Sequence, residues 1–199
     1  MSICSASAQN FSVEGVAGMN VSNLGGVGAK IGFHAGARFE LAIPAITEGI
    51  YTNAGLLFSL KGYALDWGVV RSKSNAYYID IPIHMGYKYS VTDNFAIFGE
   101  AGPYLGVGLF GKTNTNYDYN DEKESSNIFD MLNRIDVGVG LRAGVEIMKK
   151  YTVSIGYDWG LLDSYKHSDE DYSDYDDSEI DITPGMKHTN LTISLGYKF

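Results

Sequence analysis

The stretch from Ile135 to Ile147 reads Ile-Asp-Val-Gly-Val-Gly-Leu-Arg-Ala-Gly-Val-Glu-Ile. Every odd-numbered position is apolar, whereas every even-numbered position is aspartate, glycine, arginine or glutamate. A β-strand directs successive side chains to opposite faces, while the 3.6-residue period of a helix would mix the two sets. The stretch therefore predicts a strand with one apolar face and one face of glycine and charge.

The same alternation recurs along the whole chain. The segments that follow it are 11–20, 29–41, 49–65, 77–89, 95–112, 135–147, 151–159 and 191–199. Eight is an even number of strands, as single-chain bacterial membrane barrels have. We therefore predict an all-β, eight-stranded, antiparallel up-and-down transmembrane β-barrel, formed as a single domain by residues 9–199.

Glycine indicates which face is enclosed. A soluble binding barrel also alternates, but it keeps its apolar face inside and would stay in the aqueous fraction without detergent. Most of the 24 glycines fall on the polar face, where they would only weaken a strand exposed to water. The interior of an eight-stranded barrel is just wide enough for side chains to fill. We therefore expect a polar, filled lumen and an apolar surface in contact with outer-membrane lipid.

Charges of both signs lie on the predicted lumen face and nearly balance. Each would be costly if buried without a partner, so we expect ion pairs and hydrogen bonds to close the lumen. The expected lumen ion network is Glu14, Lys30, His34, Arg38, Glu40, Lys61, Asp80, His84, Lys88, Glu100, Asp136, Arg142, Glu146 and Asp158, with Lys198 on the same face. This arrangement would leave little room for a solute channel.

Composition and motifs exclude several functions. The net charge of -9 argues against a nucleic-acid partner, which needs clustered Lys and Arg. Apolar runs such as 56–60 are far shorter than the roughly 18 residues of a membrane helix. We find no nucleophile elbow, phosphate loop or zinc spacing, so we expect no cofactor and assign no catalytic residue.

Asp80 and His84 share the lumen face but are four residues apart on one strand, about 13 Å. That is too far for a direct hydrogen bond, so we interpret them as members of the ion network. A membrane-embedded enzyme remains an alternative.

The connections between the predicted strands alternate in length. Segments 44–48, 90–94 and 148–150 are short, whereas 20–28, 65–76, 112–130 and 163–187 are long. Short turns are periplasmic and longer loops extracellular in such barrels, which would place both termini in the periplasm. The aromatic girdle expected beside the short turns is Phe11, Phe39, Tyr87, Tyr89, Phe95, Tyr151, Tyr197 and Phe199, with Trp159 and Tyr77 at the opposite rim.

The last long loop is strongly acidic from Asp163 to Asp181. Clustered carboxylates suit a divalent cation such as calcium, and the weak candidate ligands are Asp169, Asp171, Asp174, Asp176 and Asp177. The run lacks the glycine of an EF-hand loop, so a solvated, self-repelling loop is the favoured interpretation. The Tyr-rich loops 117–124 and 165–175 would suit an external protein or surface ligand.

The first eight residues have the form of the end of a signal peptide. Ala6-Ser7-Ala8 is a small-x-small sequence of the kind that signal peptidase cleaves, which predicts cleavage before Gln9. The single cysteine, Cys4, lies in this segment and cannot form an internal disulfide.

Several blocks of the chain resemble one known family. They are Gly-Phe-His-Ala-Gly at 32–36, Tyr-Ile-Asp-Ile-Pro-Ile at 78–83, Phe-Gly-Glu-Ala-Gly-Pro-Tyr-Leu-Gly at 98–106 and Leu-Gly-Tyr-Lys-Phe at 195–199. Over residues 11–199 the chain resembles the PorT-like outer-membrane β-barrel domain proteins of gram-negative bacteria. The resemblance implies a bacterial outer-membrane location, and the family's namesake is linked to protein secretion. The long acidic last loop departs from the family.

The chain ending is similar to the terminal signal read by the outer-membrane assembly machinery, which we expect as a partner. The leading functional hypothesis is a non-enzymatic, monomeric scaffold whose acidic outer loops serve envelope integrity or surface interaction. A component of a secretion or envelope assembly system is the second hypothesis.

Overall fold

The computed structural model describes residues 11–25, 27–44, 47–66, 70–117, 123–163 and 187–199. Its elements are β1 (Phe11–Leu24), β2 (Val27–Ala42), β3 (Ile50–Lys61), β4 (Ala64–Asp66), β5 (Val70–Thr92), β6 (Phe95–Tyr117), β7 (Lys123–Asn127), α1 (Ile128–Met131), β8 (Ile135–Ile147), β9 (Tyr151–Gly160) and β10 (His188–Lys198). Among these residues, no helix combines the length and hydropathy needed to cross a membrane.

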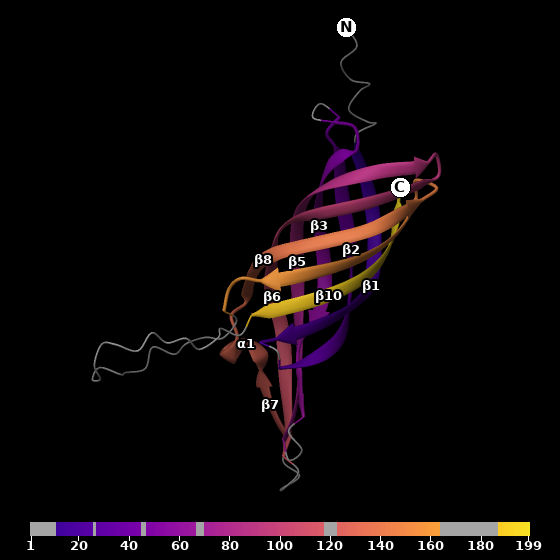
Figure 1. The fold of residues 1–199 in the computed structure, drawn as a ribbon. Coiled ribbons are helices and arrows are strands. Elements are labelled where there is room, and N and C mark those ends of the chain that lie inside the picture. The colour runs from indigo at the N-terminus through magenta and orange to yellow at the C-terminus, as the bar shows by residue number, and fades with distance from the viewer. Residues whose placement is uncertain (1–10, 26, 45–46, 67–69, 118–122, 164–186) are drawn as a thin grey trace, which may run out of the picture.

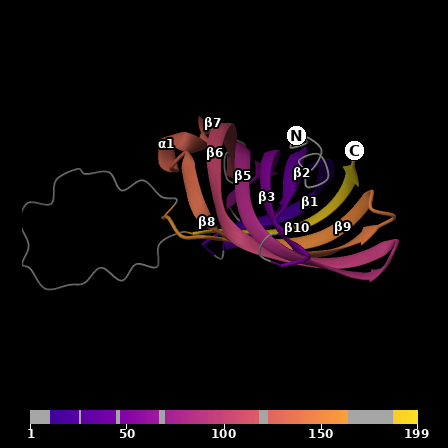
Figure 2. The ribbon, with the colours of Figure 1, turned by 90° about the horizontal axis from the view of Figure 1, so that it is seen from above.

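Eight of the strands close into a ring. The order around it is β1-β2-β3-β5-β6-β8-β9-β10 and back to β1, and every pair is antiparallel (Figure 1). At the closure, Gly18 of β1 lies opposite Ser194 of β10 and, on its other side, opposite His34 of β2. The predicted eight-stranded antiparallel up-and-down barrel is confirmed, and the view from above shows how strongly its strands curve (Figure 2).

The two faces of each strand are arranged as predicted. In β8, Val139 and Leu141 are 44% and 51% exposed on the outer surface, whereas Arg142 and Glu146 are buried inside. Most apolar side chains of the other ring strands are likewise on the outer surface, whereas Val16, Leu57 and Phe98 are buried on the lumen side. The apolar face is therefore the one available to lipid, and the polar face fills the lumen.

Glycines leave space for the polar side chains in the lumen. A Cβ atom on Gly140 would lie 2.6 Å from Oδ1 of Asp158 and 3.1 Å from Nε2 of His84. A side chain there would displace the Asp158 carboxylate and press on the His84 ring. The glycine on the polar face thus lets long polar side chains cross a narrow interior.

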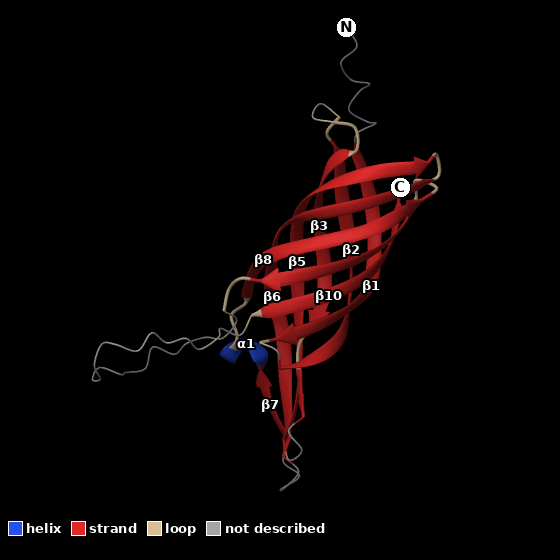
Figure 3. Cartoon of the chain, viewed as in Figure 1, coloured by secondary structure: helices blue, strands red, loops and turns tan. Residues whose placement is uncertain are grey.

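Three predicted long loops are wrong. Segments 65–76 and 112–130 mostly form strands: β5 starts at Val70, β6 continues to Tyr117, and β4 and β7 pair with them, giving a four-stranded extension β4-β5-β6-β7 (Figure 3). Segment 20–28 is a tight turn at Gly25, whose φ is +59°. Alternation failed for the extension because strands outside hydrocarbon need no apolar face; backbone pairing alone defines them.

A β-bulge separates the barrel part of β6 from the extension. Tyr77 lies opposite Phe110, but Tyr78 lies opposite Gly108, so Leu109 is the extra residue. A bulge changes which residues face each side of the sheet. Leu109 and Phe110 are therefore both exposed, and beyond them the even-numbered Lys112 is the outward residue.

Three of the connections gather at one end of the barrel, opposite the tight turn between β1 and β2. They join β2 to β3, β5 to β6 and β8 to β9, and the C-terminus lies at the same end (Figure 1). The extension and α1 lie at the opposite end. Because short turns face the periplasm in bacterial barrels, we call these the periplasmic and the outer end.

We predict that Val139→Arg lowers the free energy of unfolding by about 2–4 kcal/mol, because it places a charge in hydrocarbon near the middle of β8. Glu48→Arg, in the exposed turn between β2 and β3, is the control and should change it by less than about 0.5 kcal/mol. Urea unfolding of the barrel in lipid vesicles measures both. Equal tolerance of the two substitutions would contradict the lipid-facing assignment of β8.

Candidate functional site

Two lysines and two glutamates close the lumen at the periplasmic end. Nζ of Lys88 lies 2.6 Å from Oε1 of Glu40 and 2.8 Å from Oε2 of Glu146. Nζ of Lys198 lies 2.7 Å from Oε2 of Glu40 and 2.6 Å from Oε2 of Glu146. Because these residues come from β5, β10, β2 and β8, the periplasmic quartet ties distant parts of the ring together.

The middle of the lumen is organised around Glu100 of β6. Its carboxylate accepts hydrogen bonds from the Tyr51 hydroxyl at 2.9 Å and the Asn53 amide at 3.4 Å. It also lies 2.7 Å from Nε of Arg142 and 3.1 Å from Nδ1 of His84. These four polar partners offset the free-energy cost of removing the carboxylate from water. The Glu100 side chain is therefore fixed in position by residues of three other strands.

The Glu14 carboxylate of β1 also has polar partners in the lumen. The Thr152 hydroxyl donates to Glu14, and Nη1 of Arg38 lies 3.9 Å from the same carboxylate. The Arg38–Glu14 pair is the longest of the ion pairs in the described lumen.

The outer layer of charges is centred on Lys61. Its Nζ lies 2.8 Å from Asp80 and 3.7 Å from Asp136. The Tyr104 hydroxyl donates to Asp136 at 3.2 Å. The rings of Tyr78 and Tyr104 lie 5.1 and 5.5 Å from the Lys61 ammonium, within cation–π range.

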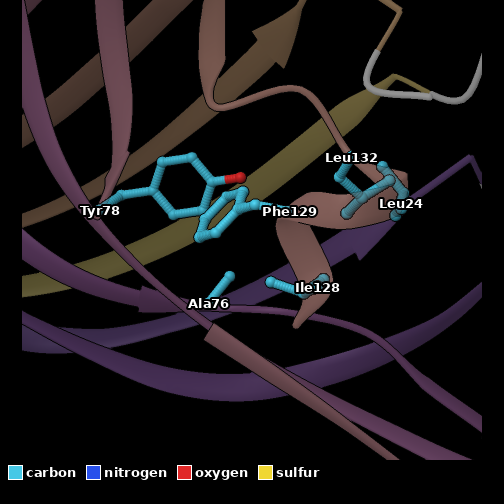
Figure 4. Packing of buried hydrophobic residues seen from close by; sticks show 6 residues of the cluster. All are labelled: Leu24, Ala76, Tyr78, Ile128, Phe129 and Leu132. Carbon is cyan, nitrogen blue, oxygen red and sulfur yellow. The ribbon is translucent and has the colours of Figure 1, made fainter. Parts of the chain in front are cut away.

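An apolar plug seals the outer mouth. It consists of Leu24, Ala76, Tyr78, Ile128, Phe129 and Leu132. The Phe129 ring of α1 meets the Tyr78 ring edge-on at a centroid distance of 5.8 Å, while Ile128 points toward Ala76 (Figure 4). Tyr78 of the plug contacts the Lys61 ammonium, and Lys61 and Asp136 are both buried beneath it.

The sequence analysis does not predict the plug, because it assigns segment 112–130 to a loop. A local signal is present: Asn127 precedes Ile128 and Phe129, and its side chain caps α1 by accepting from the Phe129 amide at 3.1 Å. One turn of helix is too short to stand out by periodicity, so the signal was easily overlooked.

A small cavity lies between the Glu100 and Lys61 layers. It is about 50 Å³ in volume, and His34, Asp80, His84, Asp158 and Asn190 are among the residues that line it. This is room for about three water molecules, whereas ligand pockets usually measure about 300–1,000 Å³. Nδ1 of His34, Nε2 of His84 and Oδ1 of Asn190 have no hydrogen-bond partner in the described part of the chain. The cavity therefore suits a few waters rather than an organic substrate.

The structure brings together most of the predicted lumen network. Lys30, His34 and Asp158 are the members that form no ion pair with another described residue. Lys30 donates instead to the Ser74 carbonyl and the Asn75 side chain. His34 exchanges a hydrogen bond with the Ser194 hydroxyl at 2.8 Å, and Asp158 accepts from the Asn190 amide at 3.2 Å.

Asp80 and His84 line the same cavity but are engaged separately. Asp80 pairs with Lys61, and His84 pairs with Glu100. Neither side chain is positioned by the other, in the way that the base and orienting group of a catalytic pair are.

The residues of the expected periplasmic girdle are all on the outer surface, 37–84% exposed. Phe11 contacts Phe39 at a ring-centroid distance of 6.3 Å, and Tyr197 contacts both Tyr151 and Phe199, at 5.5 and 5.3 Å. Their role as a membrane anchor stays a prediction.

A second aromatic row, of which the sequence analysis named only one member, lies toward the outer end. Phe33, Phe58, Tyr77 and Phe110 follow one another across β2, β3, β5 and β6, with centroid distances of 6.5, 5.6 and 4.6 Å. Phe33 and Phe58, and likewise Phe58 and Tyr77, are offset by two residues in the strand register. Each strand contributes one ring, so the row cannot be recognised in the sequence of any single strand.

The candidate metal ligands Asp169, Asp171, Asp174, Asp176 and Asp177 lie outside the described residues, as do the predicted signal-peptide end and most of both Tyr-rich loops. Within the described ranges, no group of three or more His, Cys, Asp or Glu side chains could hold a metal ion.

We predict that Lys61→Met lowers the free energy of unfolding by about 3–5 kcal/mol, because it leaves Asp80 and Asp136 buried without their cation. Asp158→Asn should change it by less than about 1 kcal/mol, since it breaks no ion pair. Urea unfolding in the same vesicles compares the two variants. An Asp158→Asn loss as large as that of Lys61→Met would show that Asp158 has a stabilising cation partner.

Comparison with known proteins gives one family match. The profile of the outer membrane protein beta-barrel domain family matches residues 6–166. No curated protein sequence matches the chain.

Solved structures similar to this chain include three proteins. Neisserial surface protein A (NspA) is 12% identical, with 95% of this chain and 97% of that chain covered and a TM-score of 0.49. Ail, the attachment invasion locus protein of Yersinia pestis, is 11% identical, with 96% and 98% covered and a TM-score of 0.43. OprG from Pseudomonas aeruginosa is 10% identical, with 96% of each chain covered and a TM-score of 0.48.

Proposed function

We propose, from the premise that this chain belongs to the outer membrane protein beta-barrel domain family and resides in the bacterial outer membrane, that it is a non-enzymatic scaffold. Its barrel would anchor the β4-β5-β6-β7 extension and the long acidic loop at the cell surface. The role that follows is envelope integrity or contact with an external protein or surface ligand.

The closed lumen is the observation that carries this proposal. The periplasmic quartet fills one end, and the apolar plug around Phe129 fills the other. Between them the cavity is about 50 Å³. A barrel filled in this way supports rigidity better than solute passage, because its charges are committed to one another.

The extension supports a role in contact at the surface. β5 and β6 remain paired from Val70 opposite Tyr117 inward, and β4 and β7 add to their two edges. Such paired strands are stiffer than free loops, and rigid scaffolds commonly present binding residues in this manner.

An enzymatic role is disfavoured by the same geometry. Asp80 and His84 already have partners, and the cavity they share is several-fold smaller than an ordinary ligand pocket. Turnover of lipid or peptide that is lost in Asp80→Asn or His84→Ala would restore the enzymatic alternative.

A secretion or envelope assembly role, as in PorT-like proteins, is the second candidate. One observation bears on it: the two distinctive blocks of the resemblance pair directly, with Asp80 opposite Gly106 and Pro82 opposite Tyr104. The blocks thus form one lumen unit, because Asp80 and Tyr104 both belong to the Lys61 layer. Loss of secreted proteins from the medium of a deletion strain would favour this candidate over the scaffold.

The last strand suits recognition during assembly. Leu191, Ile193 and Leu195 face outward, and Phe199 is 84% exposed at the periplasmic end. We expect the outer-membrane assembly machinery to recognise this strand and the folded barrel to be a monomer.

We predict that the purified barrel in planar lipid bilayers gives no stable conductance, since both ends of its lumen are closed. Phe129→Ala, which removes one ring of the plug, should also give no conductance, because the Lys61 layer and the periplasmic quartet remain. The triple variant Phe129→Ala, Lys61→Ser, Lys88→Ser is the positive control and should conduct ions. Its resistance to detergent before heating verifies that the barrel is still folded. Steady channels formed by the unmodified protein would contradict the scaffold proposal.

A further inference from the structure

A pocket of about 760 Å³ opens on the outer surface where the barrel meets the extension. It is lined by Tyr77 of β5, by Leu109, Phe110 and Lys112 of β6, and by Arg134 between α1 and β8; Asn127 at the end of β7 closes one side. The lining side chains of β5 and β6 project from the outer face of their strands, whereas Arg134 reaches the pocket from the segment between α1 and β8.

The lower half of the pocket lies at the edge of the apolar surface. Tyr77 and Phe110 are the last two members of the outer aromatic row, with ring centroids 4.6 Å apart, and Phe110 is 56% exposed. Aromatic belts mark the level at which lipid tails meet headgroups. The apolar half of the pocket therefore lies at the depth where acyl chains begin.

The upper half carries two cations. Nη1 of Arg134 donates to the carbonyls of Gly108 at 3.3 Å and Leu109 at 2.8 Å, and its guanidinium carbon lies 4.8 Å from the Phe129 ring centroid. The bulge thus holds Arg134 in place while its other N–H donors stay available, since no described residue accepts from them. Lys112 is exposed and has no hydrogen bond or ion pair among the described residues.

We propose that this pocket binds the phosphate-bearing headgroup of an anionic lipid in the outer leaflet. Lys112 and Arg134 would contact the phosphate, and Leu109 and Phe110 the first part of the acyl chains. A guanidinium fixed in position is a favourable phosphate donor, and a lysine just beyond the apolar surface reaches the headgroup layer.

Two further observations favour a lipid as occupant. The chain carries a net charge of -9. A pocket lined by two cations is therefore a local feature that the overall charge does not explain. The pocket is also half apolar and opens toward the membrane, which fits an amphipathic molecule better than a free anion. The inference needs only the outer-membrane location and is independent of the scaffold role.

Native mass spectrometry of the full-length barrel in uncharged detergent tests the proposal. The probes are phosphatidylglycerol and phosphatidylcholine with identical acyl chains, which differ in net headgroup charge. We expect one phosphatidylglycerol to bind at least tenfold more tightly than phosphatidylcholine. Lys112→Gln should weaken its binding about tenfold, the effect of one lost charge-assisted contact, and Lys112→Gln with Arg134→Gln should abolish the preference.

The matched control is Lys149→Gln with Lys150→Gln, which removes two exposed cations from the turn at the periplasmic end. It should leave phosphatidylglycerol binding unchanged. Lys112→Gln alone avoids disturbing the Arg134 contacts, and resistance to detergent before heating verifies its fold. Equal affinity for the two lipids, or an equal loss in the control, would overturn the proposal. Displacement of phosphatidylglycerol by millimolar inorganic phosphate would assign the site to a free anion instead.

Discussion

The structure depends on one constraint: in hydrocarbon, every backbone N–H and C=O must find a partner within the protein. Pairing of β1 with β10 meets it by joining the first and last strands, so the ring has no open edge. Once the ring is closed, each strand must separate its side chains into a lipid side and an enclosed side. Alternation in the sequence is the direct consequence, and the polar lumen follows from it.

Enclosure turns the polar side chains into a packing problem. Charges in a narrow interior must be paired, and they need space to reach one another across the ring. Glycine provides the space, as Gly140 does beside Asp158 and His84. The cations Lys61, Lys88 and Lys198 each lie near two carboxylates, which distributes the compensation over several strands.

The alternation in the barrel part of the chain predicts the fold, the strand number and the enclosed face, because the membrane enforces that pattern. It does not predict the extension, whose strands are polar on both sides, or the bulge at Leu109, which depends on pairing between β5 and β6. It identifies the residues of the lumen network but not their partners, since partners such as Glu100 and Arg142 are matched through register. The α1 plug and the Tyr77–Phe110 pocket arise from tertiary packing around single residues.

The strands of the barrel differ greatly in height at the outer end. β1 and β2 stop at the tight turn around Gly25, whereas β5 and β6 each have 23 residues, about twice what is needed to cross a bilayer. The outer end of the barrel is consequently asymmetric: it is low at β1 and β2 and tall at β5 and β6. A neighbouring membrane protein would therefore meet either a short side or a tall side of the barrel, depending on the direction from which it approaches.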